Sequence, residues 1–248
     1  MVDVNKSGYT LIFATISCVI CSVLLSGASV SLKDLQDKNK KIDKQRNVLM
    51  AANLATAETS AEEISTWFSK DDSGYSDIKT VIIDTETGTI NDSISLEAYT
   101  KKPKKFPESS IVYECLRKGN ECFILPITGV GLWGKLYGFL ALKPDGDNVL
   151  GISFYKHQET PGLGAEITED WFKSQFSGKK LLQTAGDFDS FRGVVVKKGI
   201  KVIDLPEKDQ AYSVDGISGA TITSVGVTGI TTKYIKEKFI PYFKNKNK

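Results

Sequence analysis

The sequence is poor in the residues from which hydrolytic and metal sites are built. It has one histidine, four cysteines and two methionines in 248 residues. A nucleophile needs a neighbouring base, and a metal ion needs several suitably spaced ligands, so we expect neither a hydrolytic site nor a metal centre. The formal net charge of +2 is also small and gives no reason to expect nucleic acid as a partner.

Charged residues are absent from residues 7–32, which is the second informative gap. The apolar stretch within it spans about 20 residues, enough to cross a hydrocarbon layer of ~30 Å as a helix. We therefore predict a tail at residues 1–8 and one transmembrane helix at 9–31. A cleaved signal peptide is the alternative, because Ser26-Gly27-Ala28 resembles a cleavage site. Cys18 and Cys21 are expected to be small apolar surface residues of this helix rather than metal ligands.

A charged stretch with a seven-residue apolar repeat follows the apolar one. Leu35, Ile42 and Leu49 carry the repeat, which is typical of an amphipathic helix. We predict a helical stalk at residues 32–70, without chemistry of its own, and a folded domain at residues 71–248.

Strand patterns dominate the first part of this domain, and helical patterns come late. That order favours the α+β class: one N-terminal transmembrane helix, then a soluble domain on a mainly antiparallel sheet. The predicted elements are a hairpin in residues 81–90, a second hairpin joining 111–115 to 122–125, strands at 137–142, 149–155 and 194–200, and helices at 167–176 and from about Thr223 onward.

The second hairpin carries two of the cysteines. If it turns at Lys118-Gly119, Cys115 and Cys122 lie directly opposite each other, with their Cα atoms about 4.5–5.5 Å apart. That separation permits a disulfide in an oxidising compartment. The sequence leaves both states open, a disulfide or two free thiols.

Residues 129–134 match the G-x-G-x-x-G dinucleotide fingerprint by letter. A nucleotide-binding fold requires a helix after this loop and an acidic residue at the end of the next strand. Residues 135–142 instead have the pattern of a strand. We therefore predict that the segment is not an NADH site.

The most specific motif lies near the C-terminus, at residues 215–224. It is a Ser-Gly-Ala-Thr box with an acidic residue before it and a serine after it, followed by a helical pattern. A helix N-terminus favours a bound anion, although a Ser/Thr/Gly segment that merely caps a helix has the same composition. The residues of this box are Asp215, Ser218, Gly219, Ala220, Thr221 and Ser224.

This box resembles the flavinylation motif of membrane respiratory complexes, in which the threonine hydroxyl is esterified to the phosphate of FMN. Over nearly its whole length the chain resembles the C subunits of the Na+-translocating NADH:quinone oxidoreductases. The resemblance implies that residues 71–248 form an FMN-binding domain, with FMN attached covalently to Thr221.

Other motifs of the resembled family occur at residues 129–134 and 157–164. The resemblance implies that Trp133 offers a flat surface to the flavin ring and that a second box, Glu159, Thr160, Leu163 and Gly164, contacts the cofactor. Lys198 is a further candidate for the electronegative edge of the flavin, although an exposed strand lysine is the simpler interpretation. His157 is expected to make a hydrogen bond that stabilises its loop rather than to act in catalysis.

The resemblance also implies a function. The protein would be a membrane-anchored electron carrier without its own NADH site, acting within a Na+-pumping NADH:quinone reductase whose other subunits are its partners. An FAD-dependent flavin transferase would be needed for maturation. Two alternatives stay open: the G subunit of a ferredoxin:NAD+ oxidoreductase, and a membrane-tethered binding or sensor module in which Thr221 is never modified.

Sequence and family disagree on the side of the membrane. The basic residues that follow the span outnumber Lys6, the only one before it, so the positive-inside rule places the domain in the cytoplasm. The family places it on the outer, periplasmic side of the bacterial inner membrane. We follow the family, because a long domain can be translocated regardless of this charge bias.

Overall fold

The structure is a computed structural model that describes residues 7–69 and 76–246. It divides into two compact units, residues 1–43 and 44–248. The first six residues of the predicted tail and the predicted boundary near residue 70 lie outside the described residues. The limits of the tail, span, stalk and domain therefore stay predictions.

Helix α1 (Ser7–Ala51) is continuous through the predicted span and into the predicted stalk. Its first part is the one described helix that is long and apolar enough to cross a membrane. Its last turn, within the second unit, is buried at Val48, Leu49 and Ala51. The chain leaves the helix through Asn53, which has a left-handed backbone with φ of 58° and donates from its side chain to the Leu150 carbonyl at 2.9 Å.

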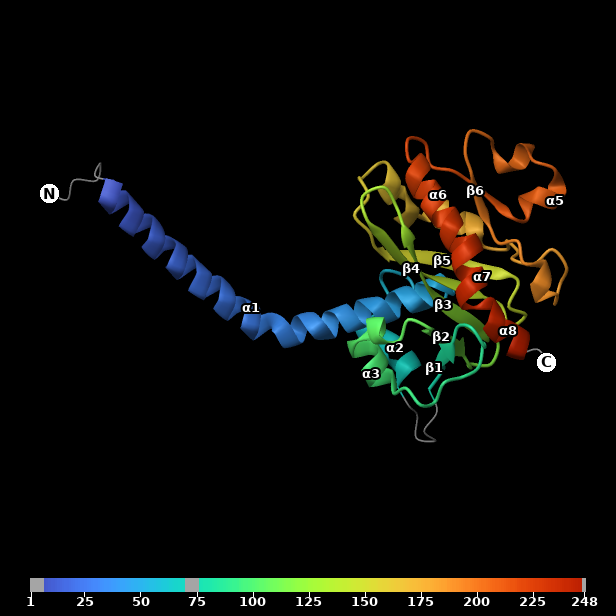
Figure 1. Ribbon diagram of the computed structural model, residues 1–248, viewed down its shortest axis with the longest axis horizontal. Coiled ribbons are helices and arrows are strands. Elements are labelled where there is room, and N and C mark those ends of the chain that lie inside the picture. Colours follow the sequence, from blue (N-terminus) through green and yellow to red (C-terminus); the bar gives the residue numbers. More distant parts are fainter. Residues whose placement is uncertain (1–6, 70–75, 247–248) are drawn as a thin grey trace. The chain divides into compact units, whose positions relative to one another are not determined.

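The core of the second unit is an antiparallel sheet in the simple order β1-β2-β3-β4-β5 (Figure 1). Alternating and continuous apolar runs bury its strands, as the sequence predicted. Along the chain, helix α2 (Ala61–Phe68) comes before the first strand of the sheet. Helix α3 (Leu96–Lys101) and the 3-10 turn η1 (Pro103–Lys105) belong to the connection from the first strand to the second. The strands are β1 (Ile78–Asp84), β2 (Ser109–Cys115), β3 (Cys122–Val130), β4 (Lys135–Leu142) and β5 (Val149–Lys156).

Both predicted hairpins are present. In the first, the bridge between Ile83 and Ile90 closes the turn after β1. In the second, Cys115 pairs with Cys122, and their Cα atoms are 4.9 Å apart. The two cysteines form a disulfide in the structure, which decides between the two states that the sequence left open.

The segment after β5 differs from the prediction of one helix at residues 167–176. It contains a 3-10 helix, η2 (Gly164–Thr168), then α4 (Asp170–Lys173) and a further 3-10 turn, η3 (Ser174–Phe176). The break lies at Glu169, whose backbone is extended with φ of −76° and ψ of 147°. This break lets Ile167, Phe172 and Phe176 all reach the core, and none of them is exposed.

A second, two-stranded sheet was not predicted. Strand β6 (Val195–Lys197) pairs in parallel with β7 (Ser213–Asp215). The predicted strand at residues 194–200 is too long, because the chain turns at Gly199, which has a φ of +72°. The short elements around this sheet are η4 (Phe188–Ser190), η5 (Val202–Asp204) and α5 (Glu207–Gln210).

The chain ends in a nearly continuous helical segment that crosses the sheet (Figure 1). It consists of α6 (Thr221–Gly229), the π-helical turn η6 (Ile230–Tyr234), α7 (Ile235–Lys238) and α8 (Ile240–Lys246). Helix α6 lies so close to β3 that a Cβ added at Gly226 would be 2.2 Å from the Val130 carbonyl oxygen. The helix begins two residues before the predicted start at Thr223.

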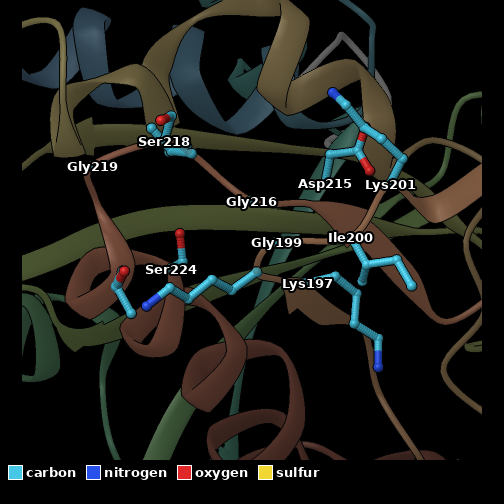
Figure 2. Close-up of a pocket in the computed structure, with 12 residues that line it drawn as sticks. Lys197, Gly199, Ile200, Lys201, Asp215, Gly216, Ser218, Gly219 and Ser224 are labelled. Carbon is cyan, nitrogen blue, oxygen red and sulfur yellow. The ribbon is translucent and has the colours of Figure 1, made fainter.

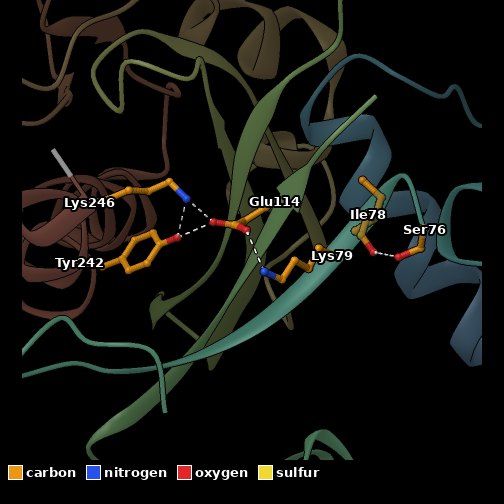
Figure 3. A network of polar contacts seen from close by, with 6 residues as sticks. All are labelled: Ser76, Ile78, Lys79, Glu114, Tyr242 and Lys246. Carbon is orange, nitrogen blue, oxygen red and sulfur yellow. Dashed lines mark hydrogen bonds and ion pairs between the residues drawn. The ribbon is translucent and has the colours of Figure 1, made fainter. Parts of the chain in front are cut away.

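The last helix is fastened to the sheet through one buried carboxylate. Glu114 on β2 accepts hydrogen bonds from the Tyr242 hydroxyl at 2.6 Å and the Lys246 ammonium at 2.5 Å. Lys79 on the neighbouring strand approaches the same carboxylate at 3.9 Å (Figure 3). Burial alone would raise the pKa of Glu114, but these hydrogen bonds and charges outweigh it and hold the pKa below its ordinary value.

Candidate functional site

The Ser-Gly-Ala-Thr box forms the turn between β7 and α6. Ser218 and Gly219 are exposed at its tip, and Ala220 is buried beneath them. Gly219 has a φ of +74°, a conformation that favours glycine. Thr221 is the first residue of α6 and is half-buried, so its side chain lies beside the free N–H groups of a helix N-terminus.

A cavity of about 410 Å³ adjoins this turn (Figure 2). One wall is the turn and the first residues of α6, and the other is the segment from Lys197 to Lys201. Its lining is rich in positive charge and in backbone that no side chain covers. The lining residues are Lys197, Lys198, Gly199, Ile200, Lys201, Asp215, Gly216, Ile217, Ser218, Gly219, Thr221 and Ser224.

Ser224 is the unusual residue of this cavity. It is only 4% exposed, and within the described chain its hydroxyl oxygen has no hydrogen-bond partner. Its side chain extends from α6 toward the segment of residues 216–219 (Figure 2). Leaving a buried hydroxyl unpaired costs about 1–3 kcal/mol. A buried donor, a helix N-terminus and three lysines are the groups that an anionic ligand such as a phosphate requires.

Asp215 holds the opposite wall in place. Its carboxylate accepts a hydrogen bond from the backbone of Val202 at 2.6 Å and lies 3.6 Å from the ammonium of Lys201. Its backbone N–H donates to the side chain of Gln175 at 2.7 Å. The residue predicted as part of the attachment motif therefore also fixes the lysine-bearing loop that includes Lys198.

Glu159 lies on the other side of α6, away from the cavity lining. It is 5% exposed and accepts hydrogen bonds from the backbone N–H groups of Leu132 at 3.1 Å and Trp133 at 2.9 Å. The hydroxyl of Thr223 donates to the same carboxylate. Burial alone would raise the pKa of Glu159. The hydrogen bonds from Thr223, Trp133 and Leu132 together lower it by more than burial raises it, so the pKa lies below its ordinary value.

The glycines of both boxes make room for this carboxylate. A Cβ added at Gly164 would be 2.6 Å from both Glu159 Oε2 and Thr223 Oγ1, and one at Gly131 would be 2.6 Å from Glu159 Oε1. The resemblance implied that Gly164 contacts the cofactor. In the structure the groups that approach it are protein side chains.

The remaining predicted residues lie at the surface around the turn. Trp133 is 65% exposed and Leu163 is 43% exposed. Leu163 contacts the turn, because one of its methyl carbons would be 2.8 Å from a Cβ added at Gly219. The Thr160 carbonyl closes the Pro-Gly turn by accepting from the N–H groups of Leu163 and Ala165, both at 3.1 Å. Leu163 therefore leaves apolar surface open at this turn, and Trp133 leaves apolar surface open at the turn after β3.

Two expectations for nearby residues are met. His157 accepts a hydrogen bond at its Nδ1 from the backbone of Glu159 at 3.1 Å, which stabilises the loop. Residues 129–134 form the end of β3 and a tight turn, closed by a hydrogen bond of 2.7 Å from Gly131 to Gly134, and β4 follows instead of a helix. Among residues 7–69 and 76–246, no group of three or more metal-ligating side chains occurs.

Sequence reasoning missed the hydrogen bond from Thr223 to Glu159 and two of the three cavity lysines. Thr223 stands next to Ser224, and the sequence alone does not show which hydroxyl faces a protein partner. Lys197 and Lys201 flank the one lysine that was singled out, so the run of basic residues at 197–201 was the available signal.

Proteins with similar sequences include C subunits of the Na(+)-translocating NADH-quinone reductase. The chain is 33% identical over 270 residues to the C subunit of the Na(+)-translocating NADH-quinone reductase of Pseudomonas aeruginosa, a match that covers 100% of this chain and 99% of that protein. It is 34% identical over 264 residues to the C subunit of the same reductase from Neisseria meningitidis, covering 97% of this chain and 94% of that protein.

Crystal structures of C subunits of this reductase have a fold similar to that of this chain. The C subunit of the reductase from Parabacteroides distasonis superposes with a TM-score of 0.69 at 26% identity, covering 86% of this chain and 96% of that chain. NqrC of Shewanella oneidensis gives a TM-score of 0.66 at 26% identity, covering 84% and 98%. The FMN-binding domain family matches residues 131–236, which contain both boxes and the lysine-lined cavity. The chain therefore belongs to the family of C subunits of the Na+-translocating NADH-quinone reductases, as a flavoprotein subunit of that complex.

Proposed function

We propose that this protein carries FMN on Thr221 through a phosphoester bond and relays electrons between other subunits of the reductase. The observation that supports this most strongly is the hydroxyl of Ser224. It is buried, it is unpartnered in the part of the chain that the structure describes, and it lines a cavity with three lysines beside Thr221. A phosphodiester there would receive a hydrogen bond and compensating positive charge.

The residues around Thr221 would have different roles in holding such a cofactor. The Thr221 hydroxyl would supply the oxygen of the ester, and the exposed Ser218 and Gly219 would leave room for an FAD-dependent transferase to reach it. Leu163 and Trp133 would give the ring an apolar surface. When bound, the flavin would supply the one-electron redox chemistry, and the chain's residues would tune its potential through hydrogen bonds and charge.

We also propose that the domain lies on the outer side of the membrane. The disulfide between Cys115 and Cys122 supports this, because such bonds persist in oxidising compartments and are rare in the cytosol. A reporter enzyme fused after the domain gives the test. Activity of a reporter that works only outside the cytoplasm supports the proposal, and activity of one that works only in the cytoplasm rejects it.

The covalent link is tested by replacing Thr221 with alanine. The full chain, coexpressed with the transferase, should show a fluorescent flavin band on a denaturing gel. The Thr221→Ala variant should lose the whole band while its free energy of unfolding changes by less than about 0.5 kcal/mol, as is usual for substitutions outside the core.

Peptide mapping locates the link directly. Trypsin should release residues 209–233 as one fragment, cut after Lys208 and Lys233. Flavin phosphate on Thr221 within that fragment is the expected result. Flavin on Thr223 or Ser224, or an undiminished band in Thr221→Ala, would reject the proposed site.

A further inference from the structure

Glu159 joins three segments that are far apart in the sequence. Its carboxylate receives hydrogen bonds from Leu132 and Trp133 in the turn after β3 and from Thr223 in the first turn of α6. All three donors are uncharged, so hydrogen bonds from neutral groups contribute most to stabilising this anion, and the charge of His157 contributes less. Charge-assisted hydrogen bonds of this kind contribute about 1.5–3 kcal/mol each.

The backbone around the carboxylate leaves no space for adjustment. Gly131 and Gly164 each approach it so closely that an added Cβ would be 2.6 Å from a carboxylate oxygen. A Cβ added at Gly226 would be 2.2 Å from the carbonyl oxygen of Val130, so α6 is also pressed against the end of β3. The first turn of α6 is thereby held at a fixed distance from the turn that carries Trp133.

The carboxylate does not line the cavity beside Thr221. The carboxylate reaches the cavity only indirectly, through Thr223, which is two residues after Thr221 in the same helical turn. The structure thus gives Glu159 contacts with the supports of the site rather than with the site's lining. This differs from the cofactor contact that the sequence predicted for it.

We propose that Glu159 is a positioning residue, which fixes Thr221 and the Trp133 turn in the arrangement needed for flavin attachment and ring cover. This rests on the proposed function, in which Thr221 carries FMN. A carboxylate is required because its two oxygens accept three donors. A glutamine has one acceptor oxygen, and its NH2 group would face an N–H donor.

The first test compares two substitutions at Thr223 in the full, detergent-solubilised chain. Thr223→Val keeps the shape of the side chain and removes the hydroxyl, whereas Thr223→Ser keeps the hydroxyl. With purified transferase and FAD, at a temperature where circular dichroism shows each variant folded, we measure the initial rate of flavin incorporation. We expect Thr223→Val to react at least tenfold more slowly than wild type and Thr223→Ser to stay within about twofold.

The second test replaces the carboxylate and needs no flavin. In Glu159→Gln, hydrogen exchange at the amides of Leu132 and Trp133 should be at least tenfold faster than in wild type. Glu166→Gln is the matched control, because it removes a carboxylate that bonds Trp171 at 2.8 Å and lies outside this cluster. Exchange at the same two amides should stay unchanged in the control.

Three outcomes would overturn the proposal: wild-type exchange in Glu159→Gln, wild-type incorporation in Thr223→Val, or equal losses in Thr223→Ser and Thr223→Val. If Glu159→Gln fails to fold, the Thr223 pair decides alone, because it leaves the carboxylate with both backbone donors. If wild type takes no flavin on Thr221, the proposed function fails, and the amide exchange still decides whether Glu159 holds the turn.

Discussion

Two neighbouring hydroxyl groups in the first turn of α6 differ in their hydrogen bonding. Toward Glu159, Thr223 is 1% exposed and its hydroxyl is bonded to a buried carboxylate. Toward the cavity, Ser224 is equally buried, but its hydroxyl has no partner among the described residues. Burial alone therefore does not identify a ligand-facing residue. We call the side of α6 on which Thr223 bonds to Glu159 the closed side, and the side on which Ser224 faces the cavity the open side. The two sides differ in whether the buried hydroxyl has a hydrogen-bond partner.

The largest effect should come from overfilling the closed side. Gly164→Ala would place a methyl group 2.6 Å from Glu159 and Thr223, which has to push both apart. We expect the free energy of unfolding to fall by about 3 kcal/mol or more, since overpacking costs 1–3 kcal/mol and a hydrogen bond weakens as well. Denaturant titration measures this.

Gly229→Ala at the end of α6 provides the control. Apart from its chain neighbours and the nearby backbone of its own helix, no heavy atom of the described residues lies within 4 Å of its added Cβ, so the substitution should be neutral or stabilise by up to about 1 kcal/mol. A Gly164→Ala protein as stable as Gly229→Ala would show that the closed side has free space.

A smaller and more selective effect should separate the two hydroxyls. Thr223→Val should lower the free energy of unfolding by about 1–3 kcal/mol, because the buried carboxylate loses a donor. Ser224→Ala in flavin-free protein should be neutral or slightly stabilising, because it removes a polar group that has no partner. Equal losses in the two variants would mean that Ser224 is already paired.

Acid should weaken the hydrogen bonds of Glu159 on the closed side. The pKa of Glu159 is lowered in the folded protein from its ordinary value of 4.5, so its contribution to stability is present above that pH and is lost as the pH falls through the folded pKa. The difference in free energy of unfolding between wild type and Glu159→Gln should therefore shrink below about pH 4.5. A difference that stays constant down to pH 3 would contradict this sign.

The smallest effect is expected on the open side. Lys198→Gln removes an exposed charge that lines the cavity, so the free energy of unfolding should change by no more than about 0.5 kcal/mol. Flavin incorporation should slow while stability stays constant, because one of three positive charges near the phosphate position is lost. A marked loss of stability would show that Lys198 supports the fold instead.

The features that could be predicted from the sequence are those set by local pattern. The hairpin pairing of Cys115 with Cys122 follows from a turn position and a two-residue period. The strand after Gly134 follows from apolar alternation, and it correctly excluded a dinucleotide fold. The apolar length of the first part of α1 was equally plain.

The features that could not be predicted depend on tertiary contacts. The difference between Thr223 and Ser224 depends on α6 beginning at Thr221, two residues before the expected start. The parallel pairing of β6 with β7 joins segments separated by irregular chain. The role of Gly164 depends on Glu159 folding back toward it, which no local pattern encodes.

The attachment of the last helix to β2 has a consequence for biosynthesis. Glu114 meets Tyr242, which lies 128 residues later in the chain. At a synthesis rate of about 5–20 residues per second, β2 waits roughly 6–25 s for this partner. The first strands therefore cannot reach their final state while the chain is still growing. Helix α6 precedes this last helix by only a few turns, so the turn at Thr221 is completed equally late. If FMN is attached there as proposed, a transferase that requires the folded site would act on finished chains.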